Sequence, residues 1–304
     1  MTSILVGAAD GVHTFGDGAH TLERVGWAED RPGAVTALAR AGSERWAIVD
    51  RHEVWRSDGD EWSHVVQSVN LELHCLADTR AGMLLGTAEA HLARVVAPPN
   101  PLESVESFDR VEGRDRWYTP WGGPPDSRSI SEDDDGLYVN VHVGGIVRSR
   151  DEGATWEPTI DVDADVHRVW AGDAGVFAAC ARGLAVSHDG GETWETRRDG
   201  LHAPYCRGVT VSGDTVLLSA SLGPRGGRAA VYRGGVSGGP LERCATGLPE
   251  WFEGNIDSAW LDATSELAAF ASADGRVFAS GDEGVTWGEV ASGLERVGAV
   301  LVVP

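Results

Sequence analysis

Three segments of this 304-residue chain repeat the pattern Ser-x-Asp-x-Gly-x-Thr-Trp, which limits the possible folds more than any other sequence feature. The repeats span residues 149–156, 187–194 and 280–287, and residues 57–62 form a shortened fourth copy. Asp and Gly favour a tight turn, because the carboxylate accepts nearby backbone N–H groups and Gly adopts positive φ without a Cβ clash. Thr and Trp then favour a return to an extended strand. The pattern therefore predicts the same hairpin turn at several places.

The repeat resembles the Asp-box, or BNR repeat, of sialidases, xyloglucanases, sortilin-type receptors and photosystem assembly factors. This resemblance implies a β-propeller, in which the Trp side chain packs between neighbouring sheets. It implies no single activity, because the family includes both enzymes and scaffolds. We expect the box carboxylates to stabilise hairpins; the alternative is that they act as catalytic acids.

The spacing of the Trp residues predicts the number of blades. Trp156 and Trp194 lie 38 residues apart, which is the length of one blade. The intervals from Trp62 to Trp156 and from Trp194 to Trp287 are 94 and 93 residues, so each holds two blades. One blade in each interval has therefore lost its box.

The two ends of the chain are expected to complete one blade together. Residues 4–25 contain three strand-like segments, and the apolar residues 297–303 supply the fourth. We therefore predict an all-β fold, a single seven-bladed propeller of four-stranded antiparallel blades, closed by pairing of the C-terminal strand with the N-terminal blade. Closure removes the exposed sheet edges. The predicted blades cover residues 1–27 with 295–304, 33–68, 71–108, 126–160, 165–198, 205–246 and 255–292.

Charge and composition narrow the possible partners. The net charge of −22 disfavours nucleic acids and anionic membranes, which both attract basic surfaces. No run of about 18 apolar residues is present, and the first residues enter a strand without a basic and apolar leader. The four cysteines lack CxxC spacing and are expected to be reduced thiols. These features predict a cytoplasmic protein.

Alignment of the innermost strands places two sets of residues at one end of the central channel, opposite the Asp-box turns. The starts of the innermost strands contribute Thr36, His74, Arg128, His167, Arg207, Asp257 and Gly298. The ends of the second strands contribute Asp50, Glu89, His142, Arg182 and Ser221. Ser, Gly and Ala would suffice to line a channel, so the His and Arg residues indicate a ligand site. They outnumber the Asp257 carboxylate of the first set, which predicts a bound anion or metal-bound ligand.

Two insertions lie on the same face of the predicted propeller. The first spans residues 97–125, and the second includes residues 221–228, with 249–252 just before Asp257. They bring Arg residues together with the aromatic residues Trp117, Tyr118, Trp121 and Trp251. The aromatic rings could stack on a planar or sugar ring of a ligand, while the Arg side chains hold its anionic group. The alternative is that the Trp residues cap the ends of blades.

Three histidines are candidates for metal binding. His74, His142 and His167 come from consecutive blades and are predicted to point toward the channel, where imidazoles hold divalent metal ions well. In architecture and residue type this is similar to cytoplasmic oligogalacturonate lyases and carotenoid oxygenases. The alternative is hydrogen bonding to loop backbone or to a bound anion. Residues 161–165, Asp-Val-Asp-Ala-Asp, lack the Gly and distal Glu of a calcium loop and are expected to be a solvated acidic loop.

Two classes of function follow. The first is an enzyme or binder for a small anionic molecule, such as a sugar acid or a ligand with a carboxylate or phosphate, in the central funnel. A metal-assisted lyase or hydrolase would use the catalytic candidates His142, His167, Arg207 and Tyr205, with the ligand-binding candidates Arg128, Asp257, Trp121, Trp251, Tyr118 and Arg182. The second is a non-catalytic scaffold that binds a protein partner on the propeller face. A sialidase is disfavoured, because the chain has no Arg-Ile-Pro motif.

Overall fold

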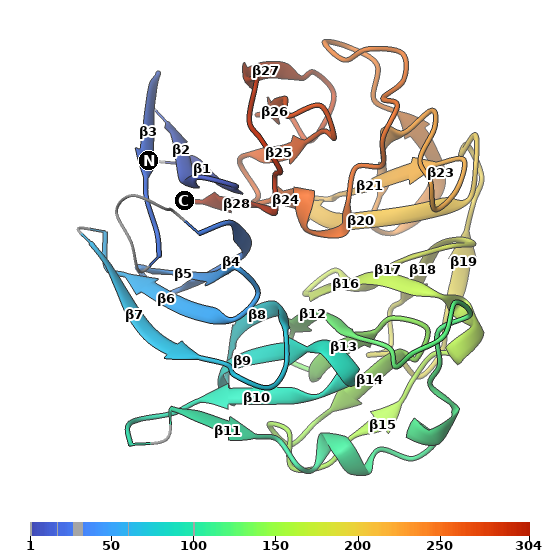
Figure 1. The fold of residues 1–304 in the computed structure, drawn as a ribbon. Helices are drawn as coiled ribbons and strands as arrows, with labels where there is room; N and C mark the ends of the chain where they lie inside the picture. Colours follow the sequence, from blue (N-terminus) through green and yellow to red (C-terminus); the bar gives the residue numbers. More distant parts are fainter. Residues whose placement is uncertain (1, 17, 27–32, 60, 100) are drawn as a thin grey trace.

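The computed structural model describes residues 2–16, 18–26, 33–59, 61–99 and 101–304. These residues form a ring of seven four-stranded antiparallel sheets around a central channel (Figure 1). Blade 1 comprises, from the channel outward, β28 (Ala299–Val303), β1 (Ser3–Ala8), β2 (Gly11–Gly16) and β3 (Ala19–Glu23). Because β28 pairs with β1, the C-terminal strand closes the ring. The predictions of seven blades and of this closure are confirmed.

The other blades each use four consecutive strands, again from the channel outward. Blades 2 to 4 are β4 (Val35–Ala41), β5 (Glu44–Val49), β6 (Glu53–Ser57) and β7 (Trp62–Gln67); β8 (Leu73–Thr79), β9 (Gly82–Thr87), β10 (Leu92–Val95) and β11 (Leu102–Ser104); and β12 (Ser127–Glu132), β13 (Leu137–Val141), β14 (Gly145–Ser149) and β15 (Glu157–Pro158). Blades 5 to 7 are β16 (Val166–Gly172), β17 (Gly175–Cys180), β18 (Gly183–Ser187) and β19 (Glu195–Arg197); β20 (Tyr205–Ser212), β21 (Thr215–Ser221), β22 (Ala230–Gly235) and β23 (Gly238–Arg243); and β24 (Leu261–Ala263), β25 (Ala268–Ala271), β26 (Val277–Ser280) and β27 (Gly288–Ala291).

Short 3₁₀ turns interrupt the loops between strands. They are η1 (Ala88–Ala90), η2 (Phe108–Arg110), η3 (Arg114–Arg116), η4 (Val162–Ala164) and η5 (Ser258–Trp260). None of the helical turns in the described part of the chain is long and apolar enough to cross a membrane.

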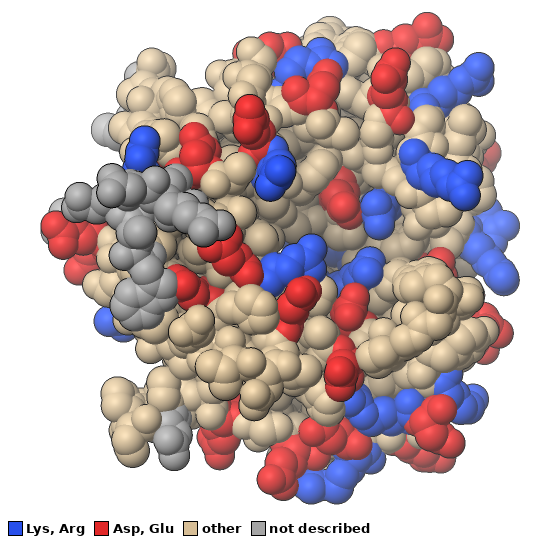
Figure 2. Space-filling model, in the orientation of Figure 1, with Lys and Arg blue, Asp and Glu red and all other residues tan. Residues whose placement is uncertain are grey.

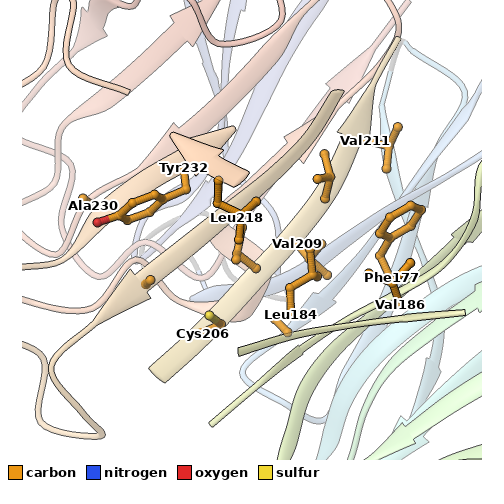
Figure 3. Close-up of a cluster of buried hydrophobic side chains, with 13 residues drawn as sticks. Phe177, Leu184, Val186, Cys206, Val209, Val211, Leu218, Ala230 and Tyr232 are labelled. Atoms are coloured by element: carbon orange, nitrogen blue, oxygen red, sulfur yellow. The ribbon is translucent and has the colours of Figure 1, made fainter. Parts of the chain in front are cut away.

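The core lies between the faces of neighbouring blades. Strand β21 is buried along its whole length, since Leu218 contacts the blade 5 side and Leu217 the blade 7 side. Figure 3 shows the cluster between blades 5 and 6, where Phe177 and Leu184 meet Val209 and Leu218. Strands β13, β14, β18 and β21 are buried along their whole length, so exposed polar residues do not alternate with buried apolar ones in them.

Each complete Asp box closes the hairpin between the third and fourth strands of its blade. In blade 5, Ser187 Oγ accepts the Gly191 N–H at 2.7 Å and donates to Asp189 at 2.8 Å. Asp189 also accepts the Thr193 N–H at 2.9 Å and the Thr193 hydroxyl at 2.6 Å. The boxes of blades 4 and 7 repeat this network with Asp151 and Asp282. The carboxylates are therefore occupied by hairpin hydrogen bonds.

Candidate functional site at the channel mouth

The innermost strands of five blades carry a β-bulge close to their first residue. In blades 2 to 5 the bulge leaves one residue without a partner on the second strand: Thr36, His74, Arg128 and His167. In blade 6, Arg207 and Gly208 lie together opposite Ser219. Five of the seven residues aligned from the sequence thus lie at bulges, whereas Asp257 and Gly298 precede β24 and β28. Bulges re-aim a side chain and are frequent beside functional sites, so the fold repeats one irregular position around the mouth of the channel.

His142, in the β13–β14 turn of blade 4, lies close to Asp165 and His167 at the start of blade 5. One ring nitrogen of each histidine and one Asp165 oxygen lie within 4.8 Å of one another. Asp165 Oδ1 is 3.5 Å from His142 Nε2 and 3.7 Å from His167 Nε2. His167 is fully buried, and its Nδ1–H donates to the Cys206 carbonyl at 2.6 Å.

Aromatic rings flank this pair of histidines on both sides. The ring centroids of His142 and His167 are 5.6 Å apart. Trp121 lies 5.2 Å from His142, and Tyr205 lies 4.8 Å from His167. The Trp121 side chain is 67% exposed, so its ring is accessible beside the histidines.

The other charged rim residues form two neighbouring groups. Asp126 accepts a hydrogen bond from Arg128 Nη2 at 3.2 Å and lies 3.9 Å from His74 Nε2. Arg207 Nε is 3.5 Å from Asp257 Oδ1. Figure 2 shows basic and acidic side chains side by side around the centre of the ring. His74 and Arg128 also line a channel cavity of about 110 Å³, whose lining does not include the histidine pair.

The histidines at the mouth are neutral near pH 7. Burial lowers the pKa of His142 to about 3, and the charges of Arg128, His167 and Arg207 add to this shift. Burial also lowers the pKa of His167, although Asp165 and the Cys206 carbonyl act in the opposite direction. The pKa of His74 is lowered by burial against the opposing charge of Asp126. Neutral imidazole is the form that binds metal ions.

Tyr205 is a hydrogen-bond donor at neutral pH. Burial raises the pKa of its hydroxyl, and the nearby charge of Arg207 opposes this only in part. The hydroxyl therefore keeps its proton, which suits donation to a ligand better than nucleophilic attack.

The charge balance differs from the one expected from the sequence. With neutral histidines, the guanidinium groups of Arg128 and Arg207 face the carboxylates of Asp126, Asp165 and Asp257. The expected excess of cations over Asp257 alone is therefore wrong, because the sequence alignment did not include Asp126 and Asp165. Asp126 lies two residues before Arg128, and Asp165 lies two residues before His167. This shared spacing is the sequence feature that could have identified both carboxylates as site residues. The expectation of a solvated loop over residues 161–165 holds for Asp161 and Asp163, which are exposed, but not for Asp165, which is half-buried.

Several predicted site residues lie elsewhere. Arg182 is exposed in the β17–β18 turn and borders a cavity with Trp194. Trp251 packs 4.6 Å from His202, under the Arg243 guanidinium. Trp117 is buried against Phe108, whereas Tyr118 from the same insertion is 55% exposed. The remaining rim residues make local hydrogen bonds or turns: Thr36, Asp50, Glu89, Ser221 and Gly298.

A larger cavity, of about 650 Å³, lies between blades 2 and 3. Its wall includes Val66, Leu92 and Leu102, with His91 and Asp109 paired at one side. None of the site residues predicted from the sequence lines it. The convergent polar groups at the channel mouth therefore remain the better candidate site.

Comparison with known proteins agrees with this architecture. The BNR/Asp-box repeat family model matches residues 185–196. Among solved structures, YCF48 bound to D1 peptide has a TM-score of 0.60 and 14% identity, covering 98% of this chain and 88% of that chain. The computationally designed Ika8 protein has a TM-score of 0.61 and 13% identity, covering 98% of this chain and 86% of that one.

A third similar structure is an enzyme. The GH74 xyloglucanase from Xanthomonas campestris has a TM-score of 0.60 and 15% identity, covering 85% of this chain but 45% of that chain. A search of the curated proteins finds no match. A natural enzyme, a peptide-bound protein and a designed protein are thus about equally similar, so the likeness shows the fold rather than an activity. The chain is a seven-bladed β-propeller that carries BNR/Asp-box repeats.

Proposed function

We propose that the channel mouth binds a small polar ligand bearing a carboxylate or phosphate group. The supporting observation is a set of buried polar atoms without a hydrogen-bond partner among the described residues: His142 Nδ1, Asp165 Oδ1, His167 Nε2 and Arg207 Nε. An unsatisfied buried polar group costs about 1–3 kcal/mol. The Arg207 Nε–H can donate to the carboxylate or phosphate of a ligand, and the acceptors Asp165 Oδ1 and His167 Nε2 can bind hydroxyl groups of the same ligand.

The residues at the mouth would contact different parts of the ligand. Arg207 makes a single ion pair with Asp257, and a guanidinium has five donors, so it keeps donors for a bound anion. Arg128 likewise pairs with one carboxylate, that of Asp126, and keeps other N–H donors for an anion. Trp121 offers an exposed ring for stacking on a sugar or planar group. In a lyase or hydrolase reaction, Tyr205 would donate a hydrogen bond, whereas His142 is too weak a base for proton abstraction at pH 7.

Thermal unfolding with added ligand tests this proposal. Inorganic phosphate and galacturonate, at saturating concentration, should raise the melting temperature by roughly 2–5 °C, because a ligand that binds only the folded state stabilises it. Arg207→Ala should remove the shift, while Arg150→Ala, which removes a half-exposed arginine of the blade 4 Asp box, should retain it. The absence of a shift with either compound, or equal loss in both variants, would contradict the proposal.

A protein partner is the second candidate function. Its support is that YCF48, a similar structure, is bound to a peptide, and that Tyr118 and Trp121 expose large aromatic surfaces on one insertion. Binding to an array of synthetic peptides would then depend on Trp121 and persist in Arg207→Ala. Peptide binding that requires Arg207 and a free carboxyl terminus would instead assign the peptide to the anion site.

A further inference from the structure

We propose that His142, Asp165 and His167 form a binding site for one divalent transition-metal ion of the zinc type. The ligand atoms lie within 4.8 Å of one another, and the Asp165 oxygen is 3.5 Å and 3.7 Å from the two imidazole nitrogens. Tetrahedral Zn²⁺ with bonds of about 2.0–2.1 Å places its ligand atoms about 3.3 Å apart. Small side-chain movements would therefore complete the site. This inference concerns a cation and does not depend on the anion proposed above.

The hydrogen bonding of His167 prepares it as a ligand. Its Nδ1–H donates to the Cys206 carbonyl at 2.6 Å, which fixes the tautomer and leaves the lone pair on Nε2. That Nε2 is buried and has no hydrogen-bond partner among the described residues. Metal-bound histidines characteristically use the second ring nitrogen in this way.

The backbone around Asp165 also supports a functional role. Asp165 follows η4 with φ 50° and ψ 67°, the left-handed region that non-glycine residues seldom adopt. Two residues later, the bulge at His167 re-aims the imidazole toward the same point. Backbone strain of this kind persists where the surrounding structure enforces it, often at binding sites.

The ligand set and its surroundings match one class of ion. Two imidazoles with one carboxylate suit zinc and related first-row ions, whereas calcium and magnesium prefer oxygen ligands alone. The Asp165 carboxylate faces both neutral imidazoles, which favours a cation at this point, whereas Arg128 and Arg207 pair with the other two carboxylates. Three protein ligands leave a coordination position for water or a ligand.

The structure separates this set from the three histidines expected from the sequence. The Nε2 atom of His74 lies 3.9 Å from Asp126, and His74 is not part of the convergent group. In the proposed metal site, Asp165 therefore takes the place that the sequence analysis gave to His74. Asp165 comes from the loop before β16 and not from a third blade.

Calorimetric titration of Zn²⁺ into metal-free protein, in a buffer without phosphate, tests the proposal. The wild type should bind one equivalent, and Asp165→Asn should weaken the affinity more than about 100-fold, as should His142→Ala. Asn fits both the volume and the left-handed backbone of Asp165, so this variant should fold. Absorption bands of bound Co²⁺ should report a four- or five-coordinate site in the wild type and vanish in Asp165→Asn.

Two matched controls identify the ligands. Asp163→Asn changes an exposed carboxylate on the same turn, and His74→Ala removes the histidine outside the group; both should bind zinc as the wild type does. No binding by the wild type, unchanged binding by Asp165→Asn, or loss of binding in either control would overturn the proposal. Arg207→Ala should keep zinc while losing the phosphate shift, so that the failure of one proposal is distinguishable from that of the other.

Discussion

Aspartate has two roles in this protein, and the neighbours of each carboxylate decide which. In the blade 5 box, Asp189 accepts hydrogen bonds from Ser187 and Thr193 and has little capacity for a ligand. These bonds lower its pKa to about 2. At the channel mouth, Asp165 Oδ1 has no hydrogen-bond partner among the described residues and faces two imidazoles. The same side chain thus holds a hairpin in one place and remains available for binding in the other.

Replacement of Asp189 by Ala should lower the melting temperature at pH 7 and leave ligand binding at the mouth unchanged. Since the folded-state pKa lies below the unfolded value of about 4, this stabilisation is present above pH 4 and is lost as the pH falls toward 2. Thermal unfolding of both proteins between pH 7 and pH 3 should show the difference shrinking. Asp173→Ala, an exposed control in the β16–β17 turn, should have little effect; a folded Asp189 variant without ligand binding would contradict a purely structural role.

Neighbouring blades are joined by polar contacts as well as by their apolar faces. Arg148 on β14 is only 2% exposed and donates to the Gly190 carbonyl of the next blade's box. It also binds Glu157 of its own blade and Glu192 of the box, the latter at 2.9 Å. One buried guanidinium thereby fixes the position of a hairpin relative to the preceding sheet.

We expect Arg148→Ala to reduce the free energy of unfolding by about 2 kcal/mol, because hydrogen bonds to charged groups and a buried carbonyl are lost together. Arg150 shares Glu192 but is half-exposed, so Arg150→Ala should cost less than about 0.5 kcal/mol. Urea unfolding of the two variants would measure both values. Equal effects would show that Arg148 contributes no more than a surface ion pair.

The ring as a whole depends on its C-terminal strand. Ala299, Val300 and Val302 are buried, and β28 is the innermost strand of blade 1. The strand also contacts blade 7, since the Val302 N–H donates to Asp262 at 2.8 Å. Its removal would therefore expose the edge of β1 and open the ring.

Deletion of residues 299–304 should abolish the cooperative thermal transition or produce oligomers, as measured by circular dichroism and size-exclusion chromatography. Leu22→Ser provides a control on β3, the outer strand of the same sheet, where the side chain is 42% exposed. It should remain monomeric with a nearly unchanged melting temperature. A deletion variant that behaves in the same way would show that closure is not required for stability.

The sequence by itself determined the repeat architecture. Box turns depend on local chemistry, Asp and Gly within a few residues, so their spacing reports the blade length directly. The start of each inner strand is likewise visible in its apolar pattern, which is why the aligned residues Thr36, His74, Arg128, His167 and Arg207 all lie at the bulges.

The tertiary structure decided which of these residues act together. His142 meets Asp165 and His167 across two blades, whereas His74 pairs with Asp126, and Arg182 and Trp251 lie outside the mouth. Such distances depend on the bulges, on the left-handed backbone at Asp165 and on the packing of one blade against the next. These features involve residues far apart in the chain, or depend on how the blades pack in the assembled ring. A local sequence pattern therefore does not encode them.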